Sequence, residues 1–225
     1  MSLLVKICGL STPDALDAAL DAGADLVGFV FFPPSPRNLA PAAARELGVQ
    51  VRGRAQKVAL TVDADDALFD AIVAALKPDI LQLHGHETPT RVTSLKERYG
   101  LPIMKAIPVE TRADLDAIAR YAGIADRFLF DARAPREATR PGGLGKPFDW
   151  HLLEAVEAGP DYLLSGGLHA GNVAEALAIT GAPGVDVSSG VERAPGEKDP
   201  AKITAFVRAA REAWKTPAGP LRTGA

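Results

Sequence analysis

The chain has 225 residues, of which 47% are hydrophobic, 24% are charged and 6% are aromatic. That composition is typical of a globular protein, and the length suffices for one domain with a large core. The formal net charge is −3, so the chain lacks the excess of basic residues that is typical of a protein that binds nucleic acid. The longest apolar runs, such as residues 26–32, are far too short to cross a membrane.

The chain begins with an apolar run, without a charged leader or a small-residue cleavage site, so no signal peptide is expected. Cys8 is the only cysteine, which excludes an internal disulfide and fits a reducing compartment. We therefore expect a cytoplasmic protein.

Eight short apolar runs, each bounded by turn residues, predict eight strands that are covered on both faces. In chain order, the expected strands are Leu3–Cys8, Leu26–Phe32, Lys57–Val62, Ile80–His84, Pro102–Ile107, Arg127–Asp131, Asp161–Ser165 and Val185–Ser188.

Helical stretches separate the strands, and several have recognisable starts. Thr12 and Pro13 place a capping hydroxyl before a proline at an early helical position, and Gly23 follows the last apolar residue of that helix. Further helix starts are expected at Pro41, Thr88-Pro89, Thr111, Asp149 and Asp199-Pro200.

This alternation of strand and helix, with short connections, predicts an α/β protein with parallel strands and right-handed crossovers. Eight units favour closure into a (β/α)8 TIM barrel over an open doubly wound sheet. We expect one catalytic barrel domain over residues 1–215. A flexible C-terminal tail is expected over residues 216–225, where proline and glycine are frequent.

The active site of such a barrel lies at the carboxyl ends of its strands and in the loops that follow them. Polar and glycine residues gather at these places in the sequence. They are Lys6–Gly9, Ser35–Arg37, Gln82–Gly85, Asp131, Gly142–Lys146, Ser165–Leu168 and Asp186–Gly190.

Cys8 ends the first expected strand, and the alternation of side chains places Lys6 on the same face, toward the barrel interior. A thiol titrates near pH ~8.5, so it needs help to act as a base at neutral pH. The alternative is a small buried hydrophobic residue, which is the commonest fate of a free cysteine.

Asp131 ends an apolar strand, where an unpaired charge would be costly. It is a candidate acid, provided that its pKa is raised above the reference value of about 3.9. The alternative is a helix cap or a partner for Arg133.

The loops after the seventh and eighth strands carry Gly166-Gly167 and Ser188-Ser189-Gly190. Barrels often bind phosphate between these two loops, on backbone N–H groups at a helix start. Gly143 and Gly145 are expected to contribute from the loop after the sixth strand. The sequence therefore predicts a small phosphorylated substrate, with plain glycine turns as the alternative.

The same segments carry a family resemblance. Together these segments resemble the phosphoribosylanthranilate isomerase family of tryptophan biosynthesis. The matching motifs are KICGL, SPR, QLHG, FLFD, GGLGKPFDW, LSGGL and DVSSGVE, followed by Gly196 and Lys198-Asp199. The match runs in the family's order from Lys6 to about Phe206. One departure is Leu144, with Pro147 shortly after it, where the family usually has a hydroxyl residue.

The resemblance implies an Amadori rearrangement of N-(5-phosphoribosyl)anthranilate to 1-(2-carboxyphenylamino)-1-deoxyribulose 5-phosphate. It implies that Cys8 is the base, that Asp131 is the acid and that Arg37 binds the anthranilate carboxylate. One acid and one base suffice because the protonated imine serves as its own electron sink. No organic cofactor is therefore expected.

Two further polar residues end strands at this face. His84 is expected either to border the substrate or to be a hydrogen-bonded structural histidine. Asp186 is a candidate for substrate binding. It is also expected to pair with Lys6, because the two strands are neighbours in a closed barrel and a lone buried charge is costly. The remaining histidines show no metal-ligand spacing with His84, so no metal is expected.

The rivals within enzymes are other phosphosugar barrels. An indole-glycerol-phosphate synthase would need a lysine-centred acid–base set, and a ribulose-phosphate epimerase would need a metal site. A catalytically silent barrel used as a binding module is the rival outside enzymes. The sequence leaves open whether the protein is a monomer or a homodimer.

Overall fold

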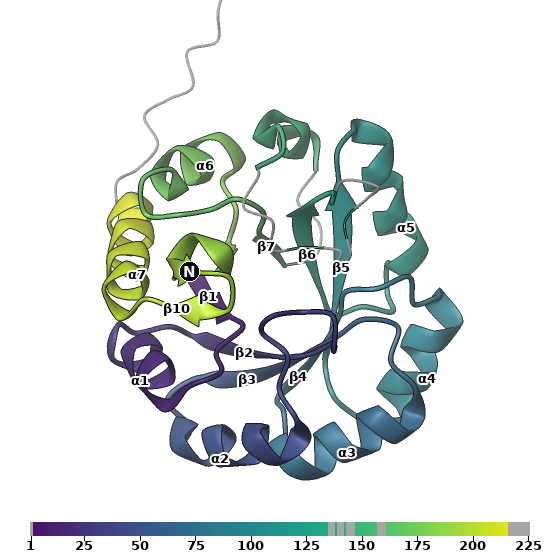
Figure 1. The fold of residues 1–225 in the computed structure, drawn as a ribbon. Coiled ribbons are helices and arrows are strands. Elements are labelled where there is room, and N and C mark those ends of the chain that lie inside the picture. Colours follow the sequence, from purple (N-terminus) through teal and green to yellow (C-terminus); the bar gives the residue numbers. More distant parts are fainter. Residues whose placement is uncertain (1, 135–137, 139–141, 143–146, 157–160, 216–225) are drawn as a thin grey trace, which may run out of the picture.

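The eight expected strands are all present and pair in sequence order around a closed barrel (Figure 1). The structure is a computed structural model, and it describes residues 2–134, 138, 142, 147–156 and 161–215. The strands are β1 (Leu4–Cys8), β2 (Leu26–Phe31), β3 (Gln56–Thr61), β4 (Ile80–Leu83), β5 (Ile103–Val109), β6 (Arg127–Ala132), β7 (Tyr162–Leu164) and β8 (Gly184–Val187). The predicted bounds differ from these by one or two residues.

Pairing of β1 with both β2 and β8 closes the barrel, and all neighbouring strands are parallel. The register places Lys6 opposite Asp186. The predicted barrel is thus confirmed, and an open sheet is excluded.

The helices form a ring outside the strands (Figure 1). They are α1 (Pro13–Asp21), α2 (Pro41–Val51), α3 (Asp66–Leu76), α4 (Pro89–Tyr99), α5 (Ala117–Tyr121), α6 (Val173–Thr180) and α7 (Pro200–Lys215), with the 3-10 helices η1 (Arg112–Asp116), η2 (Trp150–Ala155) and η3 (Ser189–Val191). The Thr12 hydroxyl accepts a hydrogen bond from the Ala15 N–H, as expected of a helix cap. Asp149 also begins a helix as predicted, although that segment is the short 3-10 helix η2.

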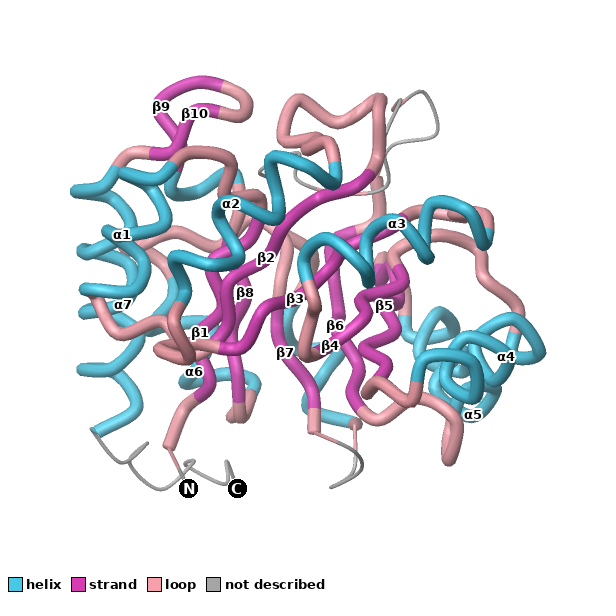
Figure 2. Tube along the Cα trace, turned by 90° about the horizontal axis from the view of Figure 1, so that it is seen from below, coloured by secondary structure: helices cyan, strands magenta, loops and turns pink. Residues whose placement is uncertain are grey.

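One element is not predicted by the sequence. β9 (Glu192–Ala194) and β10 (Glu197–Lys198) form an antiparallel pair that lies beyond the end of β8, at the top of Figure 2. Strands of two or three residues are too short to show a side-chain period, which explains why they were missed.

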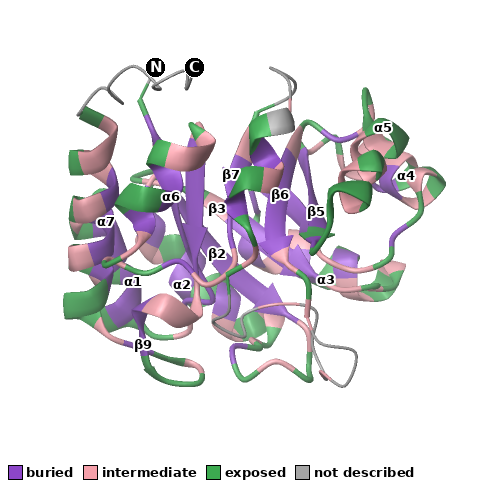
Figure 3. Ribbon diagram, turned by 90° about the horizontal axis from the view of Figure 1, so that it is seen from above, coloured by how far each residue is buried: buried purple, intermediate pink, exposed green. Residues whose placement is uncertain are grey.

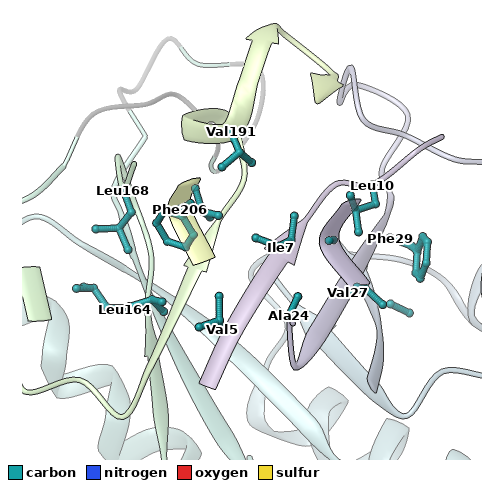
Figure 4. Close-up of a cluster of buried hydrophobic side chains, with 14 of the residues drawn as sticks. Val5, Ile7, Leu10, Ala24, Val27, Phe29, Leu164, Leu168, Val191 and Phe206 are labelled. Atoms are coloured by element: carbon teal, nitrogen blue, oxygen red, sulfur yellow. The ribbon is translucent and has the colours of Figure 1, made fainter. Parts of the chain in front are cut away.

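The core has two layers, one inside the barrel and one between the strands and the helices. Most residues of the barrel strands are buried, whereas the helices expose one face (Figure 3). In the outer layer, Phe206 of α7 is fully buried in one cluster with residues of β1 and β7 (Figure 4).

The inner layer changes character along the strands. Near the strand starts it is apolar and includes Leu26, Val58, Ile80, Met104, Leu129 and Leu163. Because inward side chains recur every second residue, the next inward positions follow two residues later. Several of these are polar and buried, namely Lys6, Gln82, Asp131, Ser165 and Asp186. The barrel interior therefore turns polar toward the carboxyl ends of the strands.

Three earlier expectations concern residues that the structure does not describe. The expected tail 216–225, the phosphate-binding role of Gly143 and Gly145, and the effect of Leu144 all lie outside the described residues. Within the described part of the chain, no helix has the length and apolar character that a membrane crossing requires.

Candidate active site

A cavity of about 290 Å³ opens where the barrel interior turns polar. Cys8 from β1 and Asp131 from β6 both line it. Seven other predicted site residues share its wall, namely Arg37, His84, Gly166, Gly167, Asp186, Ser188 and Ser189. The structure thus brings together residues that are spread over most of the sequence.

Lys6 and Asp186 form a buried ion pair beneath Cys8. The Lys6 ammonium lies 2.7 Å from Asp186 Oδ1, and the Ser165 hydroxyl donates to Asp186 Oδ2 at 2.9 Å. The predicted pairing of Lys6 with Asp186 is confirmed. Both oxygens of the Asp186 carboxylate are therefore engaged by side chains of β1 and of the loop after β7.

The Cys8 thiol is buried at the cavity wall, with 3% of the residue exposed. Burial raises the pKa of this thiol, the Lys6 ammonium acts to lower it, and the Asp186 carboxylate adds to the rise. Gly28 on β2 leaves the space that this arrangement needs. A Cβ atom at Gly28 would lie 3.0 Å from the Cys8 sulfur and 3.2 Å from Lys6 Nζ.

Asp131 is enclosed by two glycines from neighbouring loops. A Cβ at Gly142 would lie 2.4 Å from Asp131 Oδ2, and one at Gly166 would lie 3.0 Å from Oδ1. Both positions therefore need glycine for the backbone to approach the carboxyl group. Arg133 pairs with Asp114 and Glu110, so the alternative that Asp131 is a partner for Arg133 is wrong.

His84 connects Asp131 to the barrel interior. Its Nε2 lies 3.2 Å from Asp131 Oδ2, and its Nδ1 lies 3.1 Å from the Gln82 amide nitrogen. The two expectations for His84 are thus compatible, because this histidine is hydrogen-bonded on one side and also borders the cavity.

Arg37 is held by a carboxylate that the sequence reasoning missed. Its Nε and Nη2 both lie 2.7 Å from the oxygens of Glu192, and only 4% of Arg37 is exposed. Lys198 Nζ lies 2.7 Å from Glu192 Oε1 and donates to the Ser188 carbonyl at 2.8 Å. The buried charges of Arg37, Glu192 and Lys198 thereby join the loop after β2 to the loop after β8.

Burial alone would raise the pKa of Glu192, but the hydrogen bonds and charges of Arg37 and Lys198 outweigh it and lower the pKa. Gly9 makes room for this cluster at the end of β1, since a Cβ there would lie 2.6 Å from Arg37 Cδ.

The two loops expected to bind phosphate are packed backbone against backbone. Gly166 and Gly167 have φ values of +86° and +67°, which L side chains rarely adopt. A Cβ at Gly190 would lie 1.9 Å from the Leu168 carbonyl oxygen, so the loop after β8 depends on glycine at this contact. Ser188 donates its hydroxyl to the Cys8 carbonyl at 3.1 Å, which ties this loop to β1.

The site residues to which the sequence analysis gave no role differ in how that role could have been found. Gln82 and Ser165 occupy inward positions that strand alternation indicates, and a polar residue at such a position is itself a signal. Glu192 and Lys198 lie in β9 and β10, which are too short to show a side-chain period, so only the family motif pointed to them. The described residues contain no group of three or more His, Cys, Asp or Glu side chains placed to hold a metal ion.

Comparison with known proteins gives consistent matches over nearly the whole chain. Residues 5–209 match the family described as N-(5'phosphoribosyl)anthranilate (PRA) isomerase. An N-(5'-phosphoribosyl)anthranilate isomerase of Bradyrhizobium diazoefficiens is 68% identical over 211 residues, covering 94% of this chain and 95% of the relative. One of Nitrobacter winogradskyi is 65% identical over 213 residues, covering 95% of each chain.

Solved structures agree with these matches. Phosphoribosylanthranilate isomerase from Thermotoga maritima has a TM-score of 0.84 and 33% identity, covering 93% of this chain and 99% of that one. A phosphoribosylanthranilate isomerase in complex with reduced 1-(o-carboxyphenylamino)-1-deoxyribulose 5-phosphate has a TM-score of 0.82 and 30% identity, with the same coverage.

Because the pKa of Cys8 is raised, its thiol should be alkylated slowly at neutral pH. Because only the thiolate is alkylated, the rate of reaction with iodoacetamide should rise with pH and should not level off by about pH 8.5, the ordinary thiol pKa. The mass gain of the protein measures this rate, and it reports Cys8 alone because the chain has no other cysteine. A rate that levels off below pH 8 would contradict the raised pKa.

Removal of the Glu192 charge should destabilise the fold. In Glu192→Gln, Arg37 and Lys198 lose their shared counter-charge, so the free energy of unfolding should fall by about 3 kcal/mol, as measured by urea unfolding at pH 7. The folded-state pKa of Glu192 is lowered, so its stabilisation is present at neutral pH and is lost as pH falls through that pKa. The difference between wild type and variant should therefore shrink in acid.

Glu197→Gln is the matched control, because Glu197 forms an exposed ion pair with Arg193 in the same β9–β10 ribbon. Its loss should cost less than about 1 kcal/mol. Equal effects of the two substitutions would refute the structural importance of the Glu192 cluster.

Proposed function

The chain belongs to the N-(5'-phosphoribosyl)anthranilate isomerase family, and on that premise we propose that Cys8 is the base and Asp131 the acid of its reaction. The enzyme converts N-(5'-phosphoribosyl)anthranilate into 1-(2-carboxyphenylamino)-1-deoxyribulose 5-phosphate, a step of tryptophan biosynthesis. One observation carries the assignment of roles. Among the residues of the cavity, the buried Cys8 thiol and the buried Asp131 carboxyl group lie at the ends of β1 and β6, while the buried carboxyl group of Asp186 is engaged by Lys6 and Ser165.

The reaction is an isomerisation, so each proton that one group gives must be balanced by one that another takes. Asp131 donates a proton to the furanose ring oxygen, the C1–O bond breaks, and the nitrogen lone pair forms a protonated imine. The imine acidifies the hydrogen at C2, which the Cys8 thiolate removes to give an enolamine. The enolamine becomes the ketone when the Cys8 thiol protonates C1 and the C2 hydroxyl gives its proton to the Asp131 carboxylate, which restores the Cys8 thiolate and the Asp131 acid.

The surroundings of Cys8 act on its pKa in opposite directions. Burial raises the pKa of the thiol, so the thiolate from which the reaction starts is the minor form in the free enzyme. The Lys6 ammonium favours the thiolate, and Asp186 holds that ammonium in place. We assign Asp186 to this support of Lys6, while its predicted contact with substrate stays a prediction.

The remaining wall of the cavity supports a binding mode for the two ends of the substrate. The phosphate is assigned to the backbone of Gly166, Gly167, Ser188 and Ser189, with Gly190 packed behind them against Leu168. Arg37 is assigned to the anthranilate carboxylate, which a planar guanidinium matches in geometry. Glu192 fixes the Arg37 side chain in advance of binding, which reduces the entropy that binding would cost.

The activity is tested directly by mixing the protein with phosphoribosylanthranilate and following its fluorescence. Loss of that fluorescence on addition of catalytic amounts of protein is expected. No turnover would favour a silent binding barrel, whereas turnover of indole-glycerol-phosphate precursors or ribulose 5-phosphate would favour the corresponding rival enzyme.

Removal of either proton-transferring group should lower kcat without weakening binding. Cys8→Ala and Asp131→Asn should each lose ~10²–10⁴ in kcat, because that is the typical contribution of one general acid or base. KM should stay nearly unchanged, and the double variant should be little worse than the poorer single one if both groups act as a unit. A single variant with nearly wild-type kcat would overturn the role of that residue.

If the loop after β7 binds the phosphate, a substitution in it should raise KM, in contrast to the loss of kcat expected for Cys8 and Asp131. Gly167→Val should raise KM by about 10- to 100-fold, because hydrogen bonds to a charged group are worth ~1.5–3 kcal/mol. Gly181→Val is the matched control, since Gly181 also has a positive φ, +59°, but ends α6 away from the cavity. It reproduces the backbone strain without touching the site. An unchanged KM in Gly167→Val would remove this loop from the phosphate site.

A further inference from the structure

Gln82 is a polar side chain that the roles assigned above do not use. It lies on β4 inside the barrel, is fully buried, and is next to Leu60 and Met104 in the strand register. Burial of an amide among apolar side chains is costly unless hydrogen bonds compensate for the lost water. Its Oε1 accepts no hydrogen bond from the described residues, and its Nε2 contacts His84 Nδ1 at 3.1 Å.

Gln82 cannot act on the substrate directly. It does not line the cavity, whereas His84, two residues further along the same face of β4, does. Any effect of Gln82 on the reaction must therefore pass through His84. Since a methionine of similar volume would avoid the cost of a buried amide, the contact with His84 is the feature that a glutamine supplies here.

The contact determines where the His84 proton resides. A neutral imidazole has one N–H, and the partner of one ring nitrogen decides which nitrogen carries it. The Gln82 amide nitrogen is a donor, so the Nδ1 facing it must be the acceptor. The proton then lies on Nε2, which is 3.2 Å from Asp131 Oδ2.

We propose that Gln82 is a positioning residue that fixes the His84 tautomer with its proton on Nε2 and directs that N–H at the Asp131 carboxyl group. Negative charge develops on Asp131 as its proton leaves for the substrate, and a donor already in place stabilises that charge. The opposite tautomer would present a lone pair to the developing carboxylate. The catalytic consequence rests on the proposed role of Asp131 as acid, whereas the tautomer itself does not.

The tautomer is measured by 15N NMR of the side-chain nitrogens in histidine-labelled protein. The chain has four histidines, and the signals of His84 are those that disappear in His84→Asn. Wild type should show an unprotonated Nδ1 and a protonated Nε2. In Gln82→Met, which keeps the volume but cannot donate, both tautomers should be populated.

Comparison of kcat with KM shows whether Gln82 positions His84 or contributes to substrate binding. Gln82→Met should lose about 10- to 100-fold in kcat, by analogy with the loss of the hydrogen-bond partner that orients a metal-binding histidine, with KM within about twofold of wild type. Met104→Leu is the matched control, because Met104 is paired with Gln82 in the register of β4 and β5 and is also fully buried. It should change neither the tautomer nor kcat.

Each outcome decides the proposal. A single Nε2–H tautomer in Gln82→Met, an Nδ1–H tautomer in wild type, or a wild-type kcat in Gln82→Met would overturn it. If circular dichroism shows that Gln82→Met does not fold, Gln82→Leu is judged by the same two readouts. If Asp131→Asn retains wild-type kcat, the acid assignment fails, while the tautomer measurement still tests the action of Gln82 on His84.

Discussion

The buried pair of Lys6 and Asp186 is the interaction on which the rest of the site depends. It joins β1 to β8, the two strands whose pairing closes the barrel, and it lies above the apolar layer near the strand starts. A single charge at this depth would cost several kcal/mol, so neither residue is tolerable without the other. Cys8 follows Lys6 by two residues on the same face, and the pair therefore sets the electrostatic surroundings of the thiol.

The site divides its tasks between strands and loops. Cys8 and Asp131 stand on strands of the barrel, where packing on both sides limits their movement. The groups assigned to the two charged ends of the substrate stand on loops, and buried ionic contacts hold those loops. Glu192 is central to this arrangement, because it binds Arg37 and Lys198 together and Lys198 in turn holds Ser188.

Three glycines, which have no side chain, leave space for the atoms of the site. Gly28 leaves space for the sulfur and the ammonium, while Gly142 and Gly166 let two loops close over Asp131. Each lies within about 3 Å, at the Cβ position, of an atom that the proposed chemistry uses. Any larger residue would have to displace that atom, so these glycines are constraints of packing as much as of backbone conformation.

The amino-acid sequence by itself determined the eight strands, the closed barrel and the strand ends at which polar residues gather. It could do so because side-chain alternation, turn residues and helix caps are local signals, and because β1 and β8 must be neighbours in any barrel of this kind. The same logic predicted the pairing of Lys6 with Asp186. Tertiary structure alone decided that Arg37 binds Glu192 across 155 positions of the chain, that Arg133 pairs with Asp114, and that Gln82 reaches His84 Nδ1. These contacts depend on loop paths and side-chain rotamers, which follow from packing in three dimensions and leave no period in the sequence.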